Sequence, residues 1–103
     1  MKILRQGDVL LVKIDALPKC KAVGGEKEDI ILAHGEVTGH AHRIMAPSKK
    51  ARLWDANAER FLQVMETVAL THEEHSAIII DPGIYRVAIQ AEYYPTELRR
   101  VAD

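Results

Sequence analysis

Short apolar runs separated by charged and turn-forming residues dominate this chain of 103 residues. Residues 7–14 are rich in Val, Leu and Ile and begin at a glycine, which suits a strand buried on much of both faces. Further along, Tyr85, Val87 and Ile89 alternate with polar or small residues, the period of two of a half-buried strand. No segment keeps a helical period for three turns. The pattern therefore predicts an all-β protein.

Turn-forming residues divide the rest of the chain into short segments. Residues 17–29 collect a proline, a Gly-Gly pair and alternating charges and are predicted as a loop. Asn57 lies in a predicted turn, and Asp81-Pro82-Gly83 matches a type II turn. About seven short strands at this spacing are typical of a small barrel or sandwich. Further predicted strands are 30–33, 40–45, 60–66, 68–71 and 77–80, and a short C-terminal helix is predicted within 95–103.

Length and charge narrow the class of protein. A chain of this size supports a single β domain over residues 1–103. Its 14 basic and 15 acidic residues give a formal charge of -1, which argues against nucleic acid as a partner. The single Cys20 cannot form an internal disulfide, and no apolar stretch reaches ~20 residues. We therefore expect a cytoplasmic protein without a membrane partner, and the composition allows a homo-oligomer.

All five histidines fall into two short segments of the chain. His34, His40 and His42 lie in HGEVTGHAHR, and His72 and His75 lie in THEEHS. Side chains alternate along a strand, so His40 and His42 project from one face about 6 to 7 Å apart. Strand ends gather at the rims of a small barrel, so we expect the two clusters to meet in space.

Neutral imidazole is the commonest protein ligand for transition metals. The clusters predict a metal site formed by His40, His42, His72 and His75, with Zn, Fe, Ni or Mn as the ion. In an enzyme, Glu73 or Glu74 would be the general base acting on a metal-bound water. A metal-free polar pocket and unrelated surface histidines remain open alternatives, and His34 is expected outside the site. Whether the protein is an enzyme is not decided by these residues.

The H-x-H pair formed by His40 and His42 resembles the first motif of the cupin superfamily, small β-barrels that hold a metal in the barrel mouth. Gly35 and Gly39 precede the pair, as a glycine does in that motif, but no glutamate follows it closely. The P-x-G turn of the second motif is matched in part by Pro82-Gly83, with no histidine after it. The resemblance implies a metal-binding β-barrel.

Two further resemblances involve longer stretches. The run GDVLLVKID, followed by Val23-Gly24-Gly25 and a second apolar run, is similar to the N-terminal half of co-chaperonins. That similarity implies a non-catalytic protein-interaction or oligomeric module, the alternative to a metal site. As a whole, GDVLLVKI, GEVTGHAHR, LTHEEH and PGIYRV resemble a small prokaryotic family of uncharacterised all-β proteins, and this resemblance implies no activity.

Overall fold

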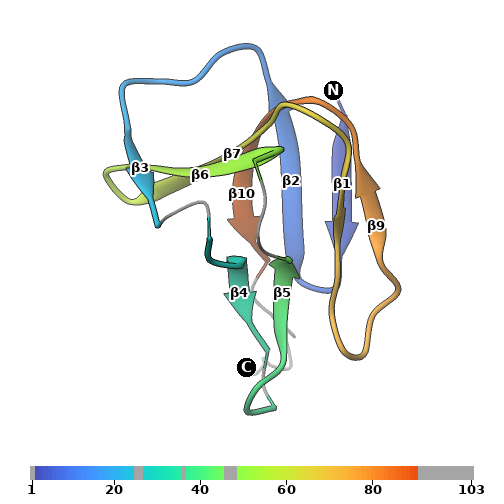
Figure 1. Cartoon of the computed structure of the whole chain (residues 1–103). Helices are drawn as coiled ribbons and strands as arrows, with labels where there is room; N and C mark the ends of the chain where they lie inside the picture. Colours follow the sequence, from blue (N-terminus) through green and yellow to red (C-terminus); the bar gives the residue numbers. More distant parts are fainter. Residues whose placement is uncertain (1, 25–26, 36, 46–48, 91–103) are drawn as a thin grey trace, which may run out of the picture.

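The structure is a computed structural model that describes residues 2–24, 27–35, 37–45 and 49–90. These residues form ten strands and no helix (Figure 1), which confirms the all-β prediction. Over the same described ranges, no helix is long and apolar enough to cross a bilayer. The helix predicted within 95–103 lies outside the described residues.

The largest layer is a six-stranded antiparallel sheet. Its two edge strands, β1 and β3, do not pair with each other, so the sheet stays open. A closed barrel is therefore not formed by the described strands, and a sandwich-like arrangement fits. In pairing order the strands are β1 (Ile3–Gln6), β2 (Val9–Ile14), β10 (Gly83–Ile89), β7 (Glu59–Val64), β6 (Ala51–Ala56) and β3 (Lys21–Val23).

Two separate two-stranded ribbons complete the fold. One pairs β4 (Ile30–His34) with β5 (Ala41–Ile44), and the other pairs β8 (Val68–Leu70) with β9 (Ile78–Ile80). The ribbons and the sheet share one apolar core. Its fully buried side chains come from all three layers and are Val9, Leu11, Leu32, Leu62, Leu70, Ile80 and Tyr85.

Burial along β2 differs from the expectation of a strand buried on both faces. Val9 and Leu11 are fully buried, whereas Leu10 and Val12 are only half-buried. Val9 and Leu11 pack in the core that the sheet shares with both ribbons, so the alternate residues of β2 point away from this core. Val87 and Leu70, both expected on inward faces, are buried.

Two of the turns depend on residues that adopt a positive φ. The two-residue turn between β1 and β2 has Gly7 at φ 58°, and Asn57 takes the same φ between β6 and β7. The Asn57 turn is confirmed, whereas β1 was not predicted as a separate strand. The prediction of a type II turn at Asp81-Pro82-Gly83 is wrong, because Gly83 has φ 159° and the third residue of such a turn has φ of about +80°. Here the chain passes from the β8–β9 ribbon to the large sheet instead of folding back on itself.

The segment 17–29 is not a continuous loop. Its residues Lys21–Val23 form β3, which pairs with β6 as the edge of the large sheet. All three residues of this strand are exposed, so no buried face gave it an alternating apolar pattern. This strand forms because its backbone pairs with that of β6.

The inward-facing side of β10 gives the first prediction. Replacing Val87 by Asp should lower the free energy of unfolding by about 3–5 kcal/mol, because a carboxylate would enter the shared core. Replacing Arg86 by Glu, on the opposite face, should change it by no more than about 0.5 kcal/mol. Urea denaturation of both variants measures the difference, and equal losses would contradict the assignment of faces.

Candidate metal centre

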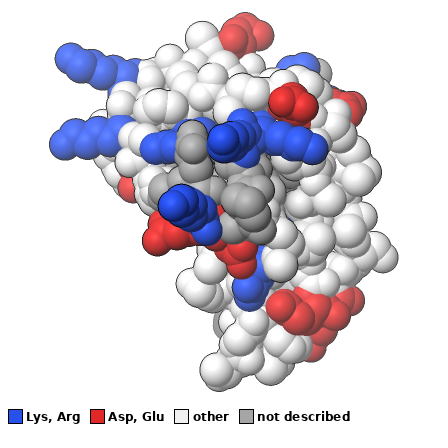
Figure 2. Space-filling model, viewed as in Figure 1, with Lys and Arg blue, Asp and Glu red and all other residues white. Residues whose placement is uncertain are grey.

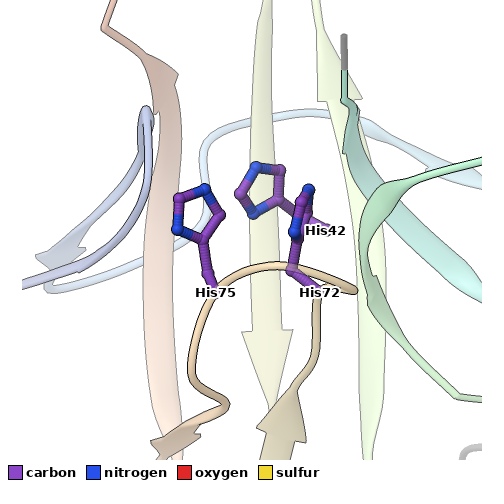
Figure 3. A group of neighbouring side chains, drawn as sticks. All are labelled: His42, His72 and His75. Carbon is purple, nitrogen blue, oxygen red and sulfur yellow. The ribbon is translucent and has the colours of Figure 1, made fainter. Parts of the chain in front are cut away.

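The two histidine clusters meet in the folded protein. His42 comes from β5, whereas His72 and His75 come from residues 71–77, here called the β8–β9 loop. Figure 3 shows the three imidazoles side by side above this loop. One ring nitrogen from each lies within 4.8 Å of the others. The predicted convergence is confirmed, although the described structure brings together three of the four histidines assigned to the site.

One antiparallel bridge between distant segments places His42 beside His72. Arg43 and Thr71 exchange two backbone hydrogen bonds, of 2.9 and 2.8 Å. In an antiparallel pair, the residues next to a bridged pair also face each other, so His42 lies opposite His72. Their ring centroids are 4.3 Å apart. His75, three residues further along the loop, stacks on His42 at 5.7 Å and 17° between the planes.

The buried side-chain amide of Gln6 fixes the orientation of the His42 ring. Its Nε2 donates hydrogen bonds to the backbone carbonyls of Leu70 (2.9 Å) and Ser76 (3.0 Å). The amide oxygen Oε1 therefore faces His42 Nδ1, at 2.8 Å. An oxygen can only accept, so His42 carries a proton on Nδ1. In the neutral ring this leaves Nε2 unprotonated, the state that a metal ligand needs.

Two glycines allow the backbone to approach the imidazoles closely. A Cβ at Gly7 would lie 2.6 Å from His75 Nε2 and 3.2 Å from His42 Cε1. A Cβ at Gly35 would lie 3.2 Å from His72 Nε2. Any side chain at Gly7 would collide with the cluster, so the turn between β1 and β2 forms one wall of the site.

His72 is held within its own loop. The backbone N–H of Glu74 donates to His72 Nδ1, at 3.0 Å. A neutral ring that accepts at Nδ1 carries its proton on Nε2. Ligation of a metal through Nε2 would require His72 to move that proton to Nδ1 and give up the hydrogen bond. For an exposed bond this would cost about 1 kcal/mol, well below the free energy of a typical metal site.

The other residues predicted for the site lie around the three imidazoles. His40 precedes β5, with its ring centroid 6.0 Å from that of His72 and its Nδ1 3.5 Å from Glu74 Oε2. Glu73 Oε1 accepts the backbone N–H of Ala41 at 2.9 Å. Glu73 therefore connects the loop to β5. His34 is exposed at the end of β4, outside the group of three, as expected.

The surroundings of the site are acidic. Acidic side chains gather over the β8–β9 loop, whereas a row of Lys and Arg crosses the region of β6 and β7 (Figure 2). Asp8 Oδ1 lies 3.3 Å from His42 Nε2. The hydrogen bond from Ala41 holds the pKa of Glu73 below its usual range, with help from the charge of Arg43. Carboxylates gathered around imidazoles favour a cation at this position.

Burial lowers the pKa of His42. Loss of solvent is the main cause, and the neighbouring His72 lowers it further, whereas Asp8 opposes the shift. The folded protein therefore favours a neutral His42, the form that binds metals.

Gln6, Gly7 and Asp8 border the site and were not predicted from the sequence. The Gly-Asp pair between two apolar runs is a hairpin signal and would have indicated β1 and its turn. No local pattern indicates that this turn packs on histidines more than thirty residues away. Gln6 carries no signal of its own, because a glutamine at a strand end is ordinarily a surface residue.

Replacing Gln6 by Leu should destabilise the protein by about 2–4 kcal/mol, because the carbonyls of Leu70 and Ser76 and the Nδ1–H of His42 would lose their partner. Gln63 is the matched control, since its side chain is half-buried and accepts a hydrogen bond from Trp54 Nε1. Its change to Leu should cost about 1 kcal/mol. Urea denaturation of the metal-free proteins measures both, and equal losses would contradict the role assigned to Gln6.

The lowered pKa of His42 makes stability depend on pH. The unfolded chain binds the proton near the ordinary pKa of 6.5, above the folded value, so stability is full above this pH and falls below it. The urea midpoint of the metal-free protein should therefore be lower at pH ~5.5 than at ~7.5. His42→Asn should weaken this dependence. The effect of Glu73 is separate, because its stabilisation is lost only below the usual carboxyl pKa of 4.5. A higher midpoint at the lower pH would contradict the assignment.

No curated protein and no solved structure shows significant similarity to the chain. The cupin and co-chaperonin resemblances are therefore not confirmed. A family comparison does give a match, and it covers residues 5–90. This range contains the three clustered histidines together with Gln6 and Asp8, so the site lies within the matched domain. The chain belongs to the family described as Domain of unknown function (DUF8820).

Proposed function

We propose that this domain binds a divalent transition metal ion through the imidazoles of His42, His72 and His75. The observation that carries the proposal is the convergence of one ring nitrogen from each to within 4.8 Å of the others. Ligands of a tetrahedral zinc ion lie about 3.3 Å apart, so shifts of roughly 1–2 Å would close the site. His75 is exposed and His72 half-buried, which leaves both side chains room to turn.

The protonation state of His42 supports the same proposal. Its Nδ1–H donates to Gln6, an arrangement typical of metal-ligating histidines, which use one nitrogen for the metal and the other for a protein acceptor. Gln6 is itself fixed by two backbone carbonyls. The ring is thus held in position before an ion arrives, which reduces the ordering cost of binding.

The ligand types narrow the choice of ion. Imidazole nitrogen suits Zn, Fe and Ni, and Mn becomes suitable as carboxylate oxygens are added. Zinc fits best, because this redox-inactive ion accepts three imidazoles and one further ligand in a tetrahedral site. The contact of Glu73 with Ala41 supports a role in holding the loop, in preference to general-base catalysis.

Metal binding should be lost when one ligand is removed. Untagged protein should retain or take up about one equivalent of zinc, and saturation at ~100 times the Kd should stabilise the fold by about 2.7 kcal/mol. His75→Ala should abolish the rise in melting temperature, and His34→Ala, at an exposed position outside the site, should preserve it. The rise should also vanish as the pH falls through ~6, because protons compete for the nitrogens.

Elemental analysis and thermal melts with and without added zinc measure these effects. A wild-type protein that neither carries zinc nor responds to it would contradict the proposal. So would an equal response from the His75→Ala variant.

A further inference from the structure

Asp8 brings a carboxylate beside His42, one member of the group of three histidines, from a third segment of the chain. It is the second residue of the turn between β1 and β2, and its Oδ1 lies 3.3 Å from His42 Nε2. The backbone around it is fixed. Gly7 supplies the positive φ of the turn, and the Asp8 carbonyl accepts the N–H of Gln90 at 2.7 Å.

The contact between Asp8 and His42 lacks a hydrogen in the neutral state. Gln6 places the His42 proton on Nδ1, so Nε2 presents a lone pair toward the carboxylate. Two acceptors at this distance repel each other unless a cation lies between them. A separation of 3.3 Å is also the distance between two ligands at about 2.0 Å from one tetrahedral ion.

We propose that Asp8 is the fourth ligand of the metal bound by His42, His72 and His75. This inference rests on the proposed function, and it assigns a structural role to the metal site. Four protein ligands leave no open coordination position, which is the arrangement of structural sites, whereas catalytic sites keep one position for water. The ion therefore cross-links three segments, which are the β1–β2 turn, β5 and the β8–β9 loop.

Among the described residues, the β8–β9 loop makes fewer hydrogen bonds to the side of the β1–β2 turn than to β5. It is joined to β5 by the bridge of Arg43 with Thr71 and by the hydrogen bond from the Ala41 N–H to Glu73. On the side of the turn it accepts one hydrogen bond, from Gln6 at Ser76. His75 and Glu74 in the same loop are exposed. An ion that ligates Asp8 and both loop histidines would close the loop onto the turn, where Gly7 leaves space for the rings.

The test is a titration of metal-free protein with Co²⁺, whose visible spectrum reports its coordination, and then with Zn²⁺. The variants are Asp8→Ala, His75→Ala and the control Asp15→Ala, an exposed carboxylate at the opposite end of β2. Asp8→Ala should weaken zinc binding about 10- to 100-fold, whereas Asp15→Ala should bind as the wild type does. Melting of each metal-free variant shows whether it is folded.

Addition of azide tests whether the bound Co²⁺ has an open coordination position, and this measurement does not depend on the affinity for the metal. The spectrum of the wild-type Co²⁺ protein should be unchanged by azide, because no position is open, whereas Asp8→Ala should respond as azide enters the vacated position. A wild-type spectrum that changes with azide as the Asp8→Ala spectrum does would overturn the inference. So would zinc binding by Asp8→Ala equal to that of the wild type.

The two proposals fail in different ways. If Asp8→Ala matches the wild type while His75→Ala loses the metal, the histidine site stands and Asp8 is not a ligand. If the wild type binds neither Co²⁺ nor Zn²⁺, both proposals are overturned.

Discussion

The buried side-chain amide of Gln6 connects the three layers of this protein. From the end of β1 it donates to Leu70 at the end of β8 and to Ser76 in the β8–β9 loop, and it accepts from His42 in β5. The hydrogen bonds with Leu70 and His42 are buried, so either of these groups without Gln6 would be a buried polar atom without a partner, at a cost of about 1–3 kcal/mol. The large sheet, both ribbons and the histidines therefore share one hydrogen-bond network, and the position of each depends on the others.

The same network explains why the site lies at a junction of layers. Only at the ends of the strands do the turn between β1 and β2, the β8–β9 loop and the start of β5 come together. The apolar core beneath is fully buried, with Leu11, Leu70 and Ile80 inaccessible to solvent. It provides the rigid support on which a ligand set needs to be built. The histidine cluster also depends on a glycine, since Gly7 leaves the space that the rings of His75 and His42 occupy.

The acidic side chains serve different purposes around this junction. Glu73 holds β5 through the N–H of Ala41 and lies 3.7 Å from the guanidinium of Arg43. Within the described part of the chain, the Asp8 carboxylate instead faces the lone pair of His42. The sequence pattern pointed to Glu73 and Glu74 because they lie between two histidines. The contacts with β5 and His42 favour a structural role for Glu73 and a ligand role for Asp8, which is distant in sequence.

The sequence by itself determined the fold class, most strands and the three histidines that converge, although it also assigned His40, which is not part of the group of three. Apolar runs, and the alternation around Tyr85 and Val87, show within a single segment which residues of a strand are buried. The H-x-H spacing of His40 and His42 can likewise be read within one short segment. The tertiary structure decided the open sheet, the exposed strand β3 and the nearness of Gln6, Gly7 and Asp8 to His42. These features depend on which strands pair and in which register, as in the bridge between Arg43 and Thr71. Pairing between distant segments is set by the packing of the whole core, and no single stretch of residues encodes it.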